Sequence, residues 1–366
     1  MTGILQGLLA SIGGGGPGFY SWGYNNQGQL GINQVYTVRK SSPTQIGDLT
    51  TWSQISASRN GTFCAAVRSD GSLFTWGYNG QGRLGHNDSG IPRSSPTQVG
   101  ALLNWSKVTA GYKGCLAIKT DGTLWAWGYN FVGQVGDGTR ISRSSPVQIG
   151  AATTWSKIST STGLSAAIKT DNSLFVWGSE GDGGLGNNTT ALWQLNPYQL
   201  AGSWSYISVN QGGMAAIRTD GSLWGWGGNP NGIIGNNNRI NTSSPVQVGA
   251  LLTWSIVKRG YGSAAIKTDN TLWTWSANPN GNLGLNDTIN RSSPVQVGGA
   301  DWLTVSVAGG NMGAIKTDKT LWMWGNNVNG QIGDNTIIKR SSPVQIGSNS
   351  WSQVAVDSQI TLGLED

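Results

Sequence analysis

Acidic residues are scarce in this sequence, and so is histidine, the most common general base of enzymes. Glutamate occurs only at Glu180 and Glu365, and histidine only at His86. The formal net charge of +6 over 366 residues therefore arises from missing acids, and the lysines and arginines are spread along the chain. Because nucleic-acid binding usually requires clustered basic residues, we expect a mildly basic solvated surface and no specific nucleic-acid partner.

Cysteine is nearly absent as well. Cys64 and Cys115 are its two occurrences, which is too few for a disulfide framework. Each lies six residues before the aspartate of an Asp-Gly pair, at Asp70 and Asp121. The equivalent positions of later repeats are Ser165, Met214, Ser263 and Met312. A position that accepts these three residue types is typical of a small buried packing site, so we expect neither a metal pair nor a redox pair.

Long apolar runs are also missing. No stretch of 18 apolar residues occurs, so we expect no helix that spans a membrane. Residues 1–18 form an apolar leader with a Gly-rich linker, and residues 1–12 lack the basic start of a signal peptide. Apolar residues recur at helical spacing in this leader, namely Ile4, Leu5, Leu8, Leu9 and Ile12. The leader is either a frayed terminus or an anchor that docks into a groove of a partner protein. Leaders of this style resemble those of bacteriophage virion accessory proteins.

Glycine and tryptophan, by contrast, are abundant, with 57 and 19 copies that mostly follow a repeat. One tryptophan recurs at Trp22, Trp76, Trp127, Trp177, Trp226, Trp275 and Trp324. A second recurs at Trp52, Trp105, Trp155, Trp204, Trp254, Trp302 and Trp351. Between them lies the proline of a Ser-Ser-Pro motif, at Pro43, Pro96, Pro146, Pro245, Pro294 and Pro343, with a degenerate copy at Pro197. The period of about 49–54 residues matches one four-stranded blade of a β-propeller.

Residues 105–149 show the repeating unit. Alternating apolar residues predict strands over 105–109, 115–119 and 124–127, and the Asp-Gly pair at 121–122 predicts a hairpin turn between the last two. A long loop then leads to a short fourth strand over 146–149, whose proline suits a strand start or a sheet edge.

The two ends of the sequence contain complementary parts of one further unit. Residues 351–366 repeat residues 302–317 and stop just before the hairpin turn, whereas residues 19–22 align with residues 73–76, just after that turn. The sequence therefore predicts an all-β fold over residues 19–366. It is a seven-bladed β-propeller of four-stranded antiparallel blades, closed by pairing the N- and C-terminal strands in one blade. Such closure removes open sheet edges.

The repeat resembles that of the regulator of chromosome condensation family, and we expect a member of phage or bacterial type. The resemblance covers residues 19–366 and rests on Trp-Gly-x-Asn-x-x-Gly-x-Leu-Gly, as in residues 76–85, on Ser-Ser-Pro-Val-Gln-Ile-Gly and on Ala-Ile-Lys-Thr-Asp-Gly-Thr-Leu-Trp. It implies the propeller fold but little about activity, because propellers serve many functions. The family repeat often carries a histidine where Gly114 and its equivalents stand here. The acidic patches and projecting wedge of exchange-factor members are also missing, so nucleotide exchange and histone binding are not carried over.

Polar, variable loops after the third strand of each unit are candidate ligand contacts. Strand parity places these loops and the short loops near residues 110–114 at one end of the ring, and the hairpin turns with both termini at the other. Several long loops close with a basic residue before Ser-Ser-Pro, namely Lys40, Arg93, Arg143, Arg291 and Arg340. These bases either pair with an aspartate of their own loop or together grip carboxylates or phosphates of a surface polymer.

Trp193 is the one tryptophan outside the repeat positions, in a loop where Leu-Trp-Gln-Leu-Asn-Pro replaces Arg-Ser-Ser-Pro. Its indole either repacks a decayed repeat or offers a stacking platform for a sugar. Tyr112 and Tyr261, in the short loops of the same end, would extend such a surface together with Lys113 and Gln211.

The sequence gives no pattern that indicates catalysis, so we predict that the chain is not an enzyme and uses no cofactor or metal. A single histidine in a variable loop is a poor candidate for a general base. Six aspartates are used by hairpin turns, namely Asp70, Asp121, Asp171, Asp220, Asp269 and Asp318. A cell-wall hydrolase, the alternative, would depend on Asp137 or Asp334.

Two functional hypotheses follow. The first is a non-enzymatic virion or surface-display protein, located in a virion, anchored to a protein partner by residues 1–18 and presenting its loops to a host glycan or protein. The alternative is an intracellular protein-interaction scaffold or a regulator of the guanine-nucleotide-exchange type.

Overall fold

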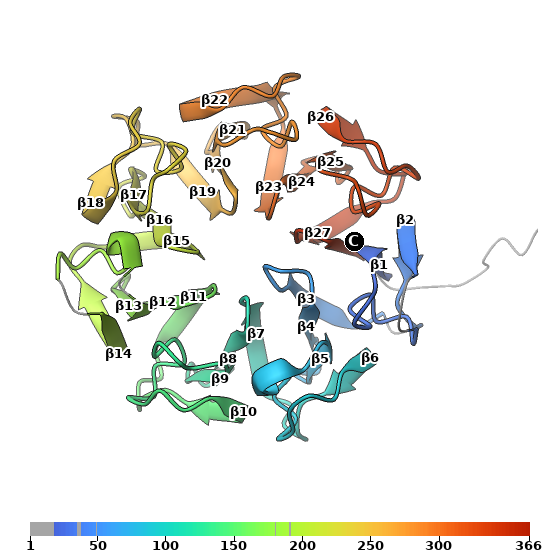
Figure 1. The fold of residues 1–366 in the computed structure, drawn as a ribbon, viewed down its shortest axis with the longest axis vertical. Helices are drawn as coiled ribbons and strands as arrows, with labels where there is room; N and C mark the ends of the chain where they lie inside the picture. The colour runs from blue at the N-terminus through green and yellow to red at the C-terminus, as the bar shows by residue number, and fades with distance from the viewer. Residues whose placement is uncertain (1–17, 35–37, 49, 180, 190–191) are drawn as a thin grey trace, which may run out of the picture.

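Seven antiparallel sheets of four strands each are arranged as a ring around a central axis (Figure 1). The computed structural model describes residues 18–34, 38–48, 50–179, 181–189 and 192–366. Three blades, from the innermost strand outward, are β27 (Trp351–Val356), β28 (Ile360–Glu365), β1 (Phe19–Tyr24) and β2 (Arg39–Gln45); β3 (Trp52–Ala57), β4 (Phe63–Arg68), β5 (Leu73–Gly77) and β6 (Arg93–Gln98); and β7 (Trp105–Ala110), β8 (Gly114–Lys119), β9 (Leu124–Gly128) and β10 (Arg143–Gln148).

The other four blades follow the same order. They are β11 (Trp155–Thr160), β12 (Leu164–Lys169), β13 (Leu174–Ser179) and β14 (Trp193–Leu200); β15 (Trp204–Asn210), β16 (Gly213–Arg218), β17 (Leu223–Gly227) and β18 (Thr242–Gln247); β19 (Trp254–Arg259), β20 (Gly262–Lys267), β21 (Thr271–Ser276) and β22 (Arg291–Ala300); and β23 (Trp302–Val307), β24 (Asn311–Lys316), β25 (Leu321–Gly325) and β26 (Arg340–Gln345). The predicted fold class is thus confirmed. Across the described ranges, no helix is both long and apolar enough to cross a membrane.

The closing blade joins the two ends of the chain as predicted. β1 pairs with β28, with Phe19 opposite Leu364 and Trp22 opposite Thr361. The Glu365 N–H donates to the Gly18 carbonyl at 3.0 Å, which continues the ladder towards the termini. The ring therefore has no open end between its first and last blades.

The outermost strands differ from the prediction at one end. The fourth strand was expected to begin at Pro146, but β10 begins at Arg143 and contains Pro146 at a shift in register. Proline has no backbone N–H to donate. Because β10 is the outer edge strand of its blade, no neighbouring strand loses a hydrogen bond there.

Tryptophans of the third strands hold neighbouring blades together. The Trp127 indole N–H donates to the Arg83 carbonyl of the preceding blade at 3.0 Å, and Trp226 donates to Gly184 at 3.1 Å. Gly85 has a φ of 81°, and a Cβ there would lie 2.8 Å from the Trp127 indole nitrogen. The glycine of the Leu-Gly pair thus adopts the left-handed backbone conformation, and its missing side chain leaves room for the tryptophan of the next blade.

The inward-facing positions of the repeat form the core between blades. One such core unites Trp204 and Trp226 with Leu164 and Leu174 of the preceding blade. Cys64 and Cys115 are buried free thiols, as their repeat position predicts. In the hairpin turns, Asp121 accepts from the Thr123 N–H and hydroxyl, and the other five aspartates accept in the same way. The carboxylates of the turns are thus used locally.

Candidate functional site

The end of the ring that carries the long loops and the short loops after the innermost strands is called the loop end below, and the opposite end is called the turn end. Figure 1 looks along the axis of the ring. The long loops are held by a buried asparagine: the Asn130 Oδ1 accepts from the Val135 N–H, and its Nδ2 donates to carbonyls of Thr139 and Ile141. The equivalent asparagines of five other blades accept a backbone N–H in the same way, so hydrogen bonds to a buried side chain hold these loops in place.

The four predicted loop arginines each pair with an aspartate of their own loop. The nitrogen–oxygen distances are 2.7 Å for Arg93–Asp88, 2.6 Å for Arg143–Asp137, 2.7 Å for Arg291–Asp287 and 2.6 Å for Arg340–Asp334. This is the local role that the sequence left open. Since each guanidinium already faces a carboxylate, these arginines brace their loops, and binding of an external anion by them stays an untested prediction.

Trp193 begins the outermost strand β14 and is 38% exposed. The guanidinium of Arg140, from the neighbouring blade, lies over its ring at 3.9 Å from the centroid. Arg140 also donates from Nε to the Phe131 carbonyl at 2.7 Å and lies 5.0 Å from the Phe131 ring centroid. One face of the indole is thus covered by a cation, so Trp193 is part of a composite surface.

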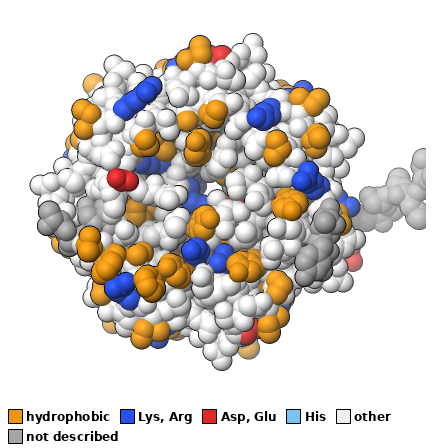
Figure 2. Space-filling view, viewed as in Figure 1, with side chains coloured by type: hydrophobic (Ala, Val, Ile, Leu, Met, Phe, Trp, Pro, Cys, Tyr) orange, Lys and Arg blue, Asp and Glu red, His pale blue; other side chains and the backbone are white. Residues whose placement is uncertain are grey.

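This surface continues towards the central axis. The rings of Phe131 and Tyr129 are stacked, with centroids 6.0 Å apart, and the Lys113 ammonium lies 4.7 Å from the Tyr129 centroid and 5.8 Å from that of Tyr112. Phe131 is 59% exposed. We call the six residues the aromatic–basic strip: Trp193, Arg140, Phe131, Tyr129, Lys113 and Tyr112. Figure 2 shows orange and blue side chains side by side over the blades of β7–β10 and β11–β14.

The strip ends at the mouth of the central channel. Tyr112 and Tyr261 help to line a hollow of about 140 Å³ there, together with Arg59, Asn210 and Gln211. The structure places Tyr112 next to Lys113 within the strip. Tyr261, 53% exposed, lies at the same mouth. Sequence reasoning missed Phe131, Arg140 and Tyr129. A signal existed, because the equivalents of Phe131 in other blades are mostly small or proline, as at Gly80, Pro230 and Pro279.

Arg59 reaches across the channel just inside this mouth. From the loop after β3, its Nη1 donates to the Arg259 carbonyl at 2.7 Å and to Asn210 Oδ1 at 3.4 Å, on the far side of the ring (Figure 1). Loss of hydration lowers the pKa of Arg59 to about 10, although nearby Asp357 opposes the shift. Arg59 lines both the hollow and the cavity deeper in the channel, so it stands between them.

Comparison with known families identifies the chain. Residues 18–363 match the model of the RCC1-like domain. The chain belongs to the RCC1-like domain family. The resemblance seen in the repeat is thereby confirmed at the level of the family and its fold.

Curated proteins align with parts of this RCC1-like chain. They include the human E3 ubiquitin-protein ligase HERC2, 32% identical over 134 residues, and from Arabidopsis thaliana the ultraviolet-B receptor UVR8, 28% over 124, and the mitochondrial RCC1 domain-containing protein RUG3, 35% over 131. The alignments cover 36%, 33% and 33% of this chain but only 3%, 28% and 28% of those proteins. These relatives are eukaryotic, so they lend no support to a phage or bacterial type of member.

Solved structures share the fold of the RCC1-like chain. Human WBSCR16 superposes with a TM-score of 0.83 at 15% identity, over 96% of this chain and 99% of that one. Yeast RCC1 (Prp20), bound to Kap60, gives 0.81 at 15% identity, over 96% and 89%. At these identities the likeness shows the architecture alone.

In the described part of this RCC1-like propeller, no three His, Cys, Asp or Glu side chains are placed to hold a metal ion. His86 lies 3.0 Å from the Thr75 hydroxyl, and burial and the charge of Arg93 lower its pKa. Burial alone would raise the pKa of Asp137 and Asp334, but hydrogen bonds from threonine and arginine outweigh it and lower both. Carboxyls held ionised in this way suit structural pairing better than acid catalysis.

Asp357 is the exception among the carboxyls. It follows β27, is fully buried, and its Oδ2 finds no hydrogen-bond partner within the described residues. Burial raises its pKa from 3.8 to about 7, although the Ser358 hydroxyl and the Gly61 N–H bind the carboxylate and oppose the shift. Between these two pH values the folded chain keeps a proton that the unfolded chain releases, so stability falls as pH rises through this window.

We therefore expect Asp357→Asn to remove this pH dependence. The wild type should lose on the order of 3 kcal/mol between pH 4 and pH 8 relative to the variant, because each pKa unit is worth about 1.4 kcal/mol. Urea denaturation at both pH values measures the difference, with Asp48→Asn, at an exposed aspartate, as the control. Parallel pH profiles for wild type and Asp357→Asn would contradict this account of Asp357.

Proposed function

We propose that this chain is a non-catalytic protein-interaction propeller, a scaffold or regulator that binds a partner protein through the aromatic–basic strip. The observation that carries the proposal is the exposure of Trp193, Phe131 and Arg140 in one packed group at the loop end. Tryptophan, tyrosine and arginine are the residues that most often dominate binding energy at protein interfaces.

The geometry also indicates the chemistry of the partner. Arg140 and Lys113 lie against aromatic rings, and no ion pair to either is found among the described residues. A partner with a carboxylate-bearing surface around an apolar centre would therefore complement the strip. A yeast relative of this fold, Prp20p, is described by its binding to Gsp1p and histones, so a small GTPase is the first class of partner to test.

Sugar binding and a virion role have less support. Arg140 covers one face of the Trp193 indole, which leaves less of it for stacking on a sugar. Residues 1–18 were expected to anchor the chain through Ile4, Leu5, Leu8, Leu9 and Ile12, and these five residues lie outside the described residues. Anchoring and a virion location stay predictions.

The test compares two surface variants of the full chain. Phe131→Ser/Arg140→Ala/Trp193→Ala changes three of the six residues of the strip. Leu103→Ser/Leu252→Ser, the matched control, alters exposed leucines of the turn end. A partner captured by the wild type is purified and titrated against each protein. We expect the strip variant to bind at least tenfold more weakly, about 1.4 kcal/mol, and the control to bind like the wild type.

Two outcomes would overturn the proposal. One is equal loss of binding in the strip variant and the control. The other is the absence of saturable binding for every captured protein and for small GTPases at physiological salt.

A further inference from the structure

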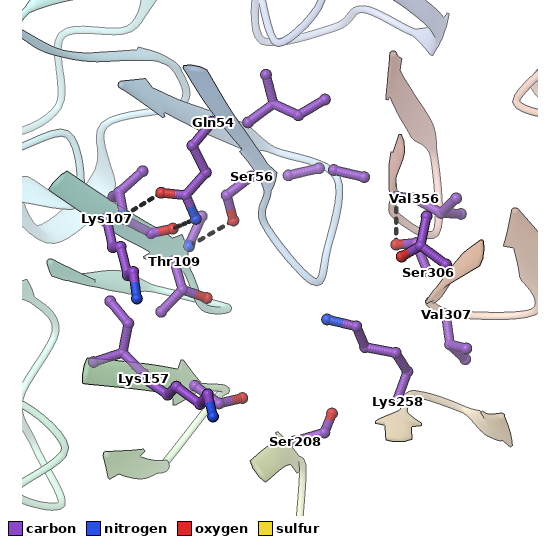
Figure 3. A pocket seen from close by; sticks show the side chains of 18 of the residues that line it. Gln54, Ser56, Lys107, Thr109, Lys157, Ser208, Lys258, Ser306, Val307 and Val356 are labelled. Carbon is purple, nitrogen blue, oxygen red and sulfur yellow. Dashed lines mark hydrogen bonds between the residues drawn. The ribbon is translucent and has the colours of Figure 1, made fainter. Parts of the chain in front are cut away.

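The innermost strands of the blades have an unpaired backbone edge at the axis of the ring. Each presents one edge to the channel without a backbone partner, and in four of the seven a serine of the preceding blade caps that edge. Ser56 Oγ accepts from the Ala110 N–H at 2.9 Å (Figure 3). The same bond at 2.9 Å joins Ser159 to Val209, Ser208 to Arg259 and Ser306 to Val356. Serine at this position therefore has a structural explanation.

Lys258 departs from this pattern. It occupies in β19 the position that Ser208 holds in β15 and Ser306 holds in β23. An ammonium group has donors but no acceptor, so Lys258 cannot cap the N–H of Val307 in the next strand. In Figure 3 its side chain extends into the open centre of the channel, towards the side where Lys107 and Lys157 lie. Capping of the edge thus does not explain this lysine.

Lys107 and Lys157 are only partly explained by capping. They stand where Gln54 stands in β3, whose amide accepts from the Val108 N–H at 2.8 Å and donates to its carbonyl at 3.0 Å. Lys107 donates to the Ser156 carbonyl and Lys157 to that of Ser205, so each ammonium uses one of its three donors. Partial burial and the charge of Lys157 both lower the pKa of Lys107.

These side chains share one cavity of about 370 Å³. Its described lining contains Arg59, Lys107, Lys157, Lys258 and Arg259 but no aspartate or glutamate. Arg259 is committed elsewhere, because its guanidinium donates to the carbonyls of Met214, Trp226 and Gly228. Four cations from four blades therefore face one cavity whose described lining contains no carboxylate. Like charges brought together in a partly enclosed site favour binding of a polyanion.

We propose that the channel is a binding site for a small polyanion that carries two or more phosphate groups. Lys107, Lys157 and Lys258 hold its oxygens through their free N–H donors, and Arg59 closes the site towards the loop end. A cavity of this volume exceeds the share of liquid occupied by one water, about 30 Å³, by roughly tenfold. It therefore accommodates a group the size of an oligophosphate.

Tripolyphosphate is the probe, and inorganic phosphate is the comparison with a single phosphate group. Calorimetry measures the affinity of each, in a phosphate-free buffer with 150 mM salt. We expect one saturable tripolyphosphate site on the wild type and at least tenfold weaker binding by inorganic phosphate. Lys258→Ser introduces the serine that four other blades carry at this position. It should lower tripolyphosphate affinity at least tenfold without lowering the melting temperature. Lys258→Arg should retain most of the affinity.

The control is Lys339→Gln, at an exposed lysine of the loop end, which should bind like the wild type. Absence of saturable tripolyphosphate binding to the wild type overturns the proposal. So does unchanged affinity in Lys258→Ser, or an equal loss in Lys339→Gln. The partner titrations alter residues of the strip, whereas the tripolyphosphate titrations alter Lys258 in the channel, so failure of either proposal is distinguishable from failure of the other.

Discussion

Replacing Trp226 with alanine is expected to lower the free energy of unfolding by about 3–5 kcal/mol. The Trp226 indole is fully buried in the core between two blades, in contact distance of Trp204 with ring centroids 5.8 Å apart. Its N–H donates to the Gly184 carbonyl of the preceding blade at 3.1 Å. The substitution leaves a large cavity and an unpaired buried carbonyl at the joint between two blades, where the surrounding strands cannot collapse freely.

Guanidinium denaturation followed by circular dichroism measures this loss. Trp226→Phe should lie between wild type and alanine, because it keeps most of the apolar volume and removes the hydrogen bond. Trp193→Ala is the matched control: its side chain is exposed, so we expect a loss of less than about 1 kcal/mol. Similar losses in Trp226→Ala and Trp193→Ala would show that the repeat tryptophans are not the joints between blades.

Deleting residues 360–366 is expected to abolish the stable ring. These residues form β28, which pairs with β27 on one side and β1 on the other. Ile360, Leu362 and Leu364 are buried there. Burial of three such side chains contributes roughly 5–9 kcal/mol to stability. This is comparable to the whole free energy of unfolding of a typical protein, about 5–15 kcal/mol. The deletion also exposes the edges of both neighbouring strands, which favours aggregation.

A circular permutant separates closure from chain order. Linking Gly18 to Asp366 and opening the chain between Gly90 and Ile91, in an exposed loop, keeps every strand pair. We expect this permutant to fold with a melting temperature near that of the wild type, and the deletion to be unfolded or aggregated by circular dichroism and gel filtration. A deletion variant that melts within a few degrees of the wild type would contradict the role given to β28.

Local signals repeated in every blade explain why the fold was predictable. The Asp-Gly turn at 121–122, the alternation around Trp127 and the second tryptophan at Trp105 each specify a short element, and seven copies leave little freedom for their arrangement. The predicted start of β10 at Pro146 was wrong for a local reason, because the strand begins at Arg143. Proline reads as a boundary unless one knows that the strand is an outer edge.

The proposed binding surface was predictable only in part. Trp193 is the tryptophan outside the repeat positions, and Tyr112 and Tyr261 lie in the short loops of the same end of the ring. Arg140 and Phe131 were missed, because the contact between Arg140 and Trp193 joins loops of two blades that are distant in the sequence. The sequence likewise left two roles open for the loop arginines. The short distances between each arginine and the aspartate of its own loop appear only in the folded structure.

The sequence by itself determined the closed ring, the use of the aspartates in the hairpin turns and the burial of both cysteines, because each follows from spacing within one repeat. Only the tertiary structure decided which side chains share a surface or a cavity. Lys107, Lys157, Lys258 and Arg59 are spread over 200 positions of the chain, from 59 to 258, yet they line one channel. The physical reason is closure of the ring, which brings one strand of every blade to a common axis. The pattern of a single repeat cannot indicate which side chains the other blades contribute there.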